Sequence, residues 1–143
     1  MTKLNLEQAN TIIQGALARG AETDCNPLTV AVLDDGGHLI AFQRQDNSSL
    51  MRYEIATGKA WGALGMGRSS RGLAQLAEQR PSFVNSLMAA SGGRLVPVPG
   101  GVLVRDSGGA MMGAVGISGD TSDKDEDCAL AGIKAAGLTA DVN

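Results

Sequence analysis

The chain has 143 residues, a net charge of −3, and 20 glycines against only 3% aromatic residues. This length suits one domain spanning residues 1–143, which buries roughly two-thirds of its unfolded surface. The sequence has no basic run and no apolar run near the roughly 20 residues that span a bilayer, so we expect neither a nucleic-acid nor a membrane partner. Its polar N-terminus carries no secretory signature, which indicates a cytoplasmic protein.

The first elements are predicted to be a helix and a strand. Apolar residues recur at helical spacing over residues 6–19, where Asn5 and Gln8 form a candidate capping box and Gly20 a candidate end. After Asn-Pro, the apolar run at residues 28–33 predicts a strand. Both of its faces are apolar, so we expect the sheet to be covered on both sides.

A tight Asp-Gly-Gly turn at residues 35–37 predicts an antiparallel return strand over residues 38–44. Because side chains alternate along a strand, four of these residues are expected to share one face. They are His38, Ile40, Phe42 and Arg44.

A small-residue helix is predicted from Ser48 or Ser49 to about Met66. It carries one stripe of glycines and one of alanines: Gly58, Gly62 and Gly65, and Ala56, Ala60 and Ala63. Each interior glycine costs roughly 1 kcal/mol against alanine, which indicates close approach by a sheet, a second helix or a flat ligand. Lys59 lies within this smooth surface.

The second half predicts helices followed by a hairpin and a last helix. A helix is predicted over residues 71–79, begun by Ser69 or Ser70, and a further helical turn over 82–89 after Pro81. Residues 95–98 are predicted to be extended, and strands are predicted over 102–105 and 110–118. The last helix is predicted over 123–138, with Ser122 and Asp125 as its capping box. Short turns make the strand pairs antiparallel. We therefore expect an α/β sandwich with a central antiparallel sheet of about five strands and helices on both faces.

Several motifs favour structural interpretations over chemical ones. The glycines of residues 113–119 lack both GxGxxG and GK[ST] spacing, and the acidic start of the next helix would repel phosphate. That acidic cluster offers oxygen ligands for calcium or magnesium but lacks EF-hand spacing, so helix capping is the favoured explanation. Cys25 and Cys128 belong to no CxxC motif and are interpreted as reduced structural thiols, with a disulfide or a reactive thiol as alternatives.

Three polar residues are candidates for binding. His38 is the single histidine, which excludes multi-histidine metal sites and leaves a structural role, a ligand contact, an acid–base role or an axial iron ligand. Arg44 and Lys59 could together pair a carboxylate on a small-residue surface. The alternative is an Arg44–Asp46 surface pair and a lysine that extends to solvent.

Three stretches resemble the GlcG/HbpS-type family, also called the haem-degrading or DUF336 domain, which includes the C-terminal domain of PduO-type proteins. They are VAVLDDGGHLIAFQRQD, IATGKAWGALGMGRSSRGL and LVPVPGGVLVRDSGGAMMGAVGISGDTSDKDEDCALAGI, and the similarity runs from about Leu6 to Gly137. The resemblance implies a profilin-like α/β sandwich, assembly into homo-oligomers, and binding of haem by some relatives. The positions that match are Asp34, Gly37, His38, Arg44, Asp46, Lys59, Pro99, Gly100, Gly101, Gly116, Gly119 and Glu126, whereas Gln45 and Asn47 depart from the family's common Met and Gly.

Three functions compete at this point. The first is a haem- or tetrapyrrole-binding protein with His38 as the iron ligand, Arg44 and Lys59 as propionate partners, and Gly100 and Gly101 at the cofactor. The second is a lyase or isomerase acting on a carboxylated or aromatic catabolite, in which Arg44 or Lys59 holds the carboxylate and His38 or Glu126 moves a proton. The third is an accessory module without chemistry.

Overall fold

The computed structural model describes residues 3–143, and these residues form an α/β fold with five helices and five strands. In chain order the elements are α1 (Leu6–Glu22), β1 (Thr29–Asp34), β2 (Leu39–Arg44), α2 (Arg52–Met66), α3 (Ser70–Gln79), α4 (Pro81–Ala90), β3 (Gly101–Arg105), β4 (Met111–Ser118), α5 (Ser122–Ala135) and β5 (Thr139–Asp141). The strands form one antiparallel sheet in the order β2-β1-β4-β3-β5. The expected fold class is confirmed.

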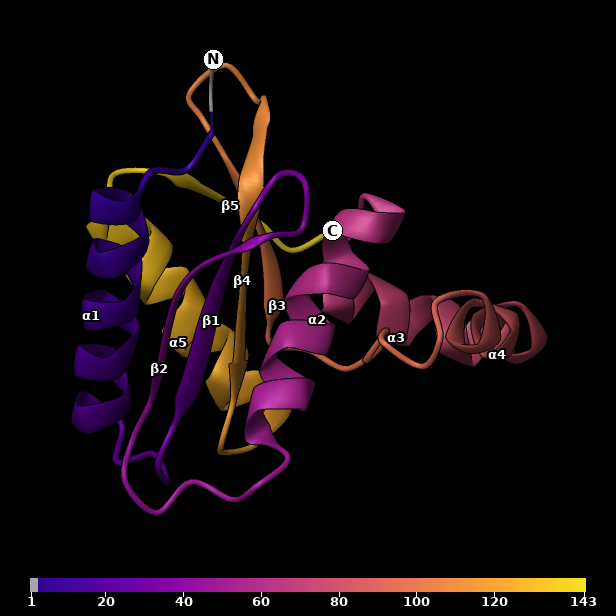
Figure 1. The fold of residues 1–143 in the computed structure, drawn as a ribbon, viewed down its shortest axis with the longest axis horizontal. Helices are drawn as coiled ribbons and strands as arrows, with labels where there is room; N and C mark the ends of the chain where they lie inside the picture. The colour runs from indigo at the N-terminus through magenta and orange to yellow at the C-terminus, as the bar shows by residue number, and fades with distance from the viewer. Residues whose placement is uncertain (1–2) are drawn as a thin grey trace.

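The sheet separates two layers of helix, with α1 and α5 on one face and α2 on the other (Figure 1). An apolar core lies on each face of the sheet, and strand β1 contributes to both. Val30 and Val32 pack with α1 and α5 on one face, while Leu33 packs with α2 on the other. Helix α3 begins against α2 and β3, and α4 extends from it away from the sheet (Figure 1). Within residues 3–143, no helix combines the length and apolarity that crossing a bilayer requires.

Helix α1 begins as expected but runs past its expected end. Asn5 and Gln8 form the complete capping box. Gly20 does not end the helix; it is buried within it, and a Cβ there would lie 2.7 Å from Cδ1 of Leu28. The glycine therefore serves close packing of the helix on the start of β1, and Thr23 caps the helix instead.

A bulge in β2 overturns the expected alternation of its side chains. The register slips between Val32 and Leu33, whose partners are Ala41 and Leu39, so Ile40 is left without a partner on β1. Ile40 packs with the α1 and α5 core, whereas the ring of Phe42 meets Tyr53 of α2 edge to face at 5.1 Å. Ile40 and Phe42 thus lie on opposite faces of the sheet.

The two small-residue stripes of α2 face different neighbours. The alanine stripe lies on β4, where a Cβ at Gly116 would overlap the carbonyl of Ala56. On the glycine stripe, Gly58 and Gly62 lie against residues 94–96, while Gly65 has open space around it. Close approach by the sheet and by a neighbouring loop therefore explains most of these small residues.

The end of the chain differs from expectation. Thr121, not Ser122, caps α5, since its hydroxyl accepts the backbone N–H of Lys124. The helix stops at Ala135, and residues 139–141 form the edge strand β5. Residues 95–98 form no strand, so the fifth strand comes from the C-terminal segment instead.

Candidate functional site

His38 lies exposed at the β1–β2 hairpin, held beside a carboxylate. Oδ1 of Asp34 accepts the backbone N–H groups of Gly36 and His38 at 3.0 and 2.9 Å and lies 3.3 Å from Nδ1 of the imidazole. Partial burial raises the pKa of Asp34, but the two N–H donors outweigh it and the net pKa is lowered. An ionised Asp34 therefore lies beside the imidazole of His38, a side chain that is 83% exposed.

A largely apolar groove of about 420 Å³ runs between α2, the β1–β2 hairpin and the loop after α4. The Arg94 guanidinium lies 3.9 Å above the centre of the Trp61 ring in this groove. The remaining lining residues are Leu33, Leu39, Met51, Tyr53, Glu54, Ile55, Thr57, Gly58, Gly93 and Val96. An apolar wall that carries one cation, Arg94, and one carboxylate, Glu54, suits a flat apolar ligand with an acidic group placed at Arg94.

His38 adjoins this groove through both of its sequence neighbours. Leu39 lines the groove, and a Cβ at Gly37 would lie 3.3 Å from Cδ1 of Trp61. The positive φ of Gly37, 83°, lets the turn pass over the indole without a side chain. The hairpin backbone on either side of His38 thus borders the groove, whereas the imidazole itself lies beside Asp34 and is not among the residues that line it.

Arg44 lies in a different place, at the far end of β2. It lines an open hollow of about 500 Å³ together with Cys25, Pro27, Gln45 and Asp46. Among the ion pairs of residues 3–143, none joins Arg44 to Asp46, so the alternative surface pair is not formed.

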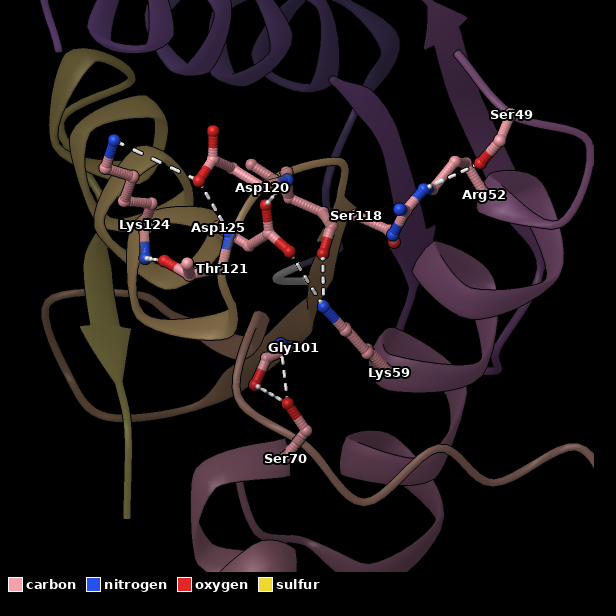
Figure 2. Close-up of polar contacts among 11 residues, drawn as sticks. Ser49, Arg52, Lys59, Ser70, Gly101, Ser118, Asp120, Thr121, Lys124 and Asp125 are labelled. Atoms are coloured by element: carbon pink, nitrogen blue, oxygen red, sulfur yellow. Dashed lines mark hydrogen bonds and ion pairs between the residues drawn. The ribbon is translucent and has the colours of Figure 1, made fainter. Parts of the chain in front are cut away.

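Lys59 lines neither the groove nor the hollow at Arg44, and its side chain is only 2% exposed. From α2 its ammonium donates to the carbonyl of Ile117 at 2.8 Å and to Oδ2 of Asp125 at 3.1 Å (Figure 2). Burial lowers the pKa of Lys59 and raises the pKa of Asp125, and the opposite charge of each partner counteracts both shifts. The alternative in which this lysine extends to solvent is therefore wrong.

Gly100 and Gly101 pack against the same lysine. A Cβ at Gly100 would lie 2.8 Å from Nζ of Lys59, and one at Gly101 would overlap the Lys59 carbonyl. The Ser70 hydroxyl accepts the N–H of Gly101 at 2.6 Å (Figure 2). These glycines lie inside the protein, and the structure does not bring them or Lys59 together with His38 or Arg44.

Acidic residues of α5 pair with cations of other elements, which sequence reasoning missed. Nε of Arg71 on α3 donates to both carboxylate oxygens of Glu126, at 3.1 and 2.9 Å. Nε of Arg19 on α1 donates to Asp127 at 2.8 Å. Residues 3–143 contain no cluster of three acidic, histidine or cysteine side chains that could hold a metal ion. Ion pairing of α5 with other helices, more than capping, thus explains the acidic cluster.

Trp61 and Arg94 were also missed as groove residues. The signal available in the sequence was weak: the single tryptophan stands on a helix of small residues, and an arginine follows the Gly92-Gly93 turn. Their stacking depends on the loop after α4 returning to α2, which no local pattern specifies.

The family model described as haem degrading protein HbpS-like matches residues 4–134. The chain belongs to the HbpS-like family. Two curated proteins of Citrobacter freundii are each 28% identical to it. One is the corrinoid adenosyltransferase PduO, where the match covers 92% of this chain but only 38% of PduO. The other, an uncharacterized 15.0 kDa protein of the dhaT-dhaS intergenic region, is matched over 85% of this chain and 84% of its own length.

Solved structures of HbpS-like proteins share the fold closely. A PduOC:haem complex superposes with a TM-score of 0.86 at 25% identity, covering 96% of this chain and 97% of that one. HbpS superposes with a TM-score of 0.80 at 27% identity, covering 94% and 90% of the two chains. The DUF336 protein ORFY of Klebsiella pneumoniae, at 22% identity with a TM-score of 0.86 and coverage of 96% and 92%, supports the fold alone.

Proposed function

We propose that this HbpS-like protein binds haem or a related tetrapyrrole in the groove along α2, with His38 as the iron ligand. The observation that carries the proposal is the position of His38, whose neighbours Gly37 and Leu39 both contact the apolar groove. The family and the solved PduOC:haem complex support haem as the ligand class. Bound haem would supply a redox-active iron.

The residues present fit such a ligand. A porphyrin provides four of the iron's ligands, so one protein imidazole is enough and a cluster of metal-binding side chains is unnecessary. Asp34 lies 3.3 Å from Nδ1 of His38, the arrangement that commonly fixes a metal-binding imidazole so that Nε2 faces the metal. The aliphatic and aromatic side chains of the groove suit the faces of the macrocycle.

We assign the role of propionate partner to Arg94, because it is the cation of the groove and adjoins Trp61. Arg44, one of the two partners expected from the sequence, lines a separate hollow and is the competing candidate. Lys59, Gly100 and Gly101 are proposed to act indirectly, by seating α2 on the sheet.

The test is a titration of hemin into the reduced protein, followed by the absorption spectrum of the Soret region. We expect saturation at about one haem per chain in wild type and loss of the ligated spectrum in His38→Ala. Arg94→Ala is expected to weaken binding about tenfold, as loss of one charge-assisted hydrogen bond does, and Arg44→Ala is the charge-matched comparison.

Unchanged binding in His38→Ala would contradict the proposed ligand. Weakening by Arg44→Ala but not by Arg94→Ala would move the ligand to the hollow at the far end of β2. Because a thiolate can also hold haem iron and Cys25 is partly exposed, Cys25→Ser must keep the wild-type spectrum.

The lyase or isomerase alternative gains no support from the geometry of the expected residues. Glu126 is 9% exposed and is held by Arg71, on a different element from the His38 hairpin. Glu126 is also not among the residues that line the groove.

A further inference from the structure

The two cysteines lie far apart in the sequence but touch in the fold. Cys25 stands in the segment between α1 and β1, and its Sγ lies 4.0 Å from Sγ of Cys128 on α5. Both are free thiols in this structure. Two sulfur atoms in van der Waals contact need only side-chain rotation and a small backbone shift to reach the bonded distance of roughly 2 Å.

Access to the two thiols is unequal. Cys128 is fully buried in the core between α1, α5 and the sheet. Cys25 is partly exposed and lines the open hollow that also contains the Arg44 side chain. The Thr23 hydroxyl lies 3.3 Å from Sγ of Cys25 and can donate to it. A small oxidant can therefore reach Cys25, with its buried partner already in contact.

We propose that Cys25 and Cys128 form a peroxide-reactive thiol pair, in which peroxide oxidises Cys25 and Cys128 then closes an intramolecular disulfide. The hollow around Cys25 is thus a reaction site for a small peroxide, separate from the α2 groove. The proposal does not depend on haem binding.

The chemistry balances with hydrogen peroxide as the oxidant. The Cys25 thiol gives its proton to solvent, and the thiolate attacks one peroxide oxygen; the O–O bond breaks, and the leaving hydroxide takes up a proton as water. Sulfur of Cys128 then attacks the sulfenic sulfur of Cys25. The S–S bond forms, the S–O bond breaks, and the hydroxyl leaves as water with the Cys128 proton. Two thiols and one peroxide give one disulfide and two waters.

The electrostatics of the pair agree with this order. The pKa of Cys128 is raised to about 12, chiefly by burial and then by the charge and hydrogen bonding of Cys25. Cys128 therefore stays protonated at first and is the poorer initial nucleophile. Oxidation of Cys25 to the neutral sulfenic acid removes the Cys25 charge, which eases deprotonation of Cys128 for the second step.

The disulfide would join positions 103 residues apart and tie the α1–β1 segment to α5. A cross-link closing a loop of this size stabilises the folded state chiefly by restricting the unfolded chain. We expect the oxidised protein to melt at least about 5 °C above the reduced one, with reversal by a thiol reductant.

The experiment treats the reduced full-length chain with a small excess of hydrogen peroxide, blocks remaining thiols with an alkylating agent, and maps peptides without reduction. Peptide mapping is needed because the six methionines can also take up oxygen. We expect the two free thiols per chain to disappear and a Cys25–Cys128 cross-linked peptide to form. Cys128→Ala should instead leave a Cys25 sulfenic acid that dimedone labels, while Cys25→Ser should keep Cys128 unmodified.

An intermolecular disulfide, equal oxidation of Cys128 in Cys25→Ser, or both thiols surviving peroxide that oxidises exposed methionines would each overturn the proposal. If Cys128→Ala fails to fold, the wild-type peptide map and the reversible change in melting temperature still decide it.

Discussion

Lys59 shows how strongly one residue can depend on partners that are distant in sequence. Its charge lies between α2, β4 and the start of α5, where Asp125 also accepts the backbone N–H of Asp120 at 2.9 Å (Figure 2). Both ions are removed from water, so either charge would be strongly destabilising without its partner. The lysine therefore joins α2 to β4 and to α5.

Lys59→Met is expected to destabilise the fold by about 3 kcal/mol or more, because it leaves a buried carboxylate without its counter-ion. Lys3→Met is the matched control, since Lys3 and Asp35 form an exposed pair at 3.6 Å; it should change stability by less than about 0.5 kcal/mol. Urea unfolding of the three proteins measures the free energies. Equal, small losses in both variants would show that the Lys59–Asp125 pair is not the link described here.

Among the elements, the seating of α2 on β4 depends on the absence of a side chain at Gly116. A Cβ there would overlap the backbone of Ala56, and the Ala60 methyl would lie 3.1 Å away. The helix axis can thus approach the sheet more closely than larger residues would permit.

Gly116→Ala should therefore cost about 1–3 kcal/mol, because backbone, not a flexible side chain, must move. Gly65→Ala makes the same change on α2 where nothing lies within 4 Å of the new methyl. That variant should be neutral or more stable by up to about 1 kcal/mol through helix propensity. Thermal and urea unfolding compare them; destabilisation by Gly65→Ala with tolerance of Gly116→Ala would contradict this account of the packing.

Local patterns predicted the helices, four strands and the antiparallel sheet, because periodicity and turn chemistry act over a few residues. They failed where tertiary packing decides. Gly20 resembles a helix end but packs on Leu28, Ile40 leaves the strand alternation at a bulge, and residues 139–141 become a strand only by pairing with β3. These outcomes depend on neighbours that a short window of sequence does not contain.

The candidate site was predictable only in part, because its contacts also join residues that are distant in the sequence. The family resemblance singled out the positions of His38 and Lys59, but it did not predict which residues surround them. The partner of Lys59 is 66 residues away and the partner of Glu126 is 55 residues away, so their ion pairs could not be predicted from spacing. Arg94 reaches Trp61 across 33 residues through an irregular loop.

At the scale of the whole molecule, the two faces of the sheet are covered unequally. Helices α1 and α5 lie over one face, while α2 lies over β4, β1 and β3 on the other (Figure 1). Strand β2 is an edge strand, and beside it the groove stays open. Four of the six large apolar side chains that are exposed among residues 3–143 belong to β2, the start of α2 or the segment between them: Leu39, Leu50, Met51 and Tyr53.

Such a grouping is typical of surfaces that associate. We propose that the chain forms homo-oligomers through the part of this surface around Leu50, which does not line the groove, in keeping with the assembly that the family resemblance implies. Leu50, at 87% exposure, is its most exposed apolar member. Leu50→Glu should lower the oligomeric state, because a second copy would have to desolvate the carboxylate.

Leu6→Glu is the matched control, since Leu6 is 58% exposed but lies on α1, over the opposite face of the sheet. A carboxylate in the first turn of that helix should be tolerated or stabilising. Sedimentation velocity at several concentrations should therefore give a smaller species for Leu50→Glu and the wild-type species for Leu6→Glu, with unchanged circular dichroism in both. A monomeric wild type, or equal dissociation by the two variants, would exclude this surface as the interface.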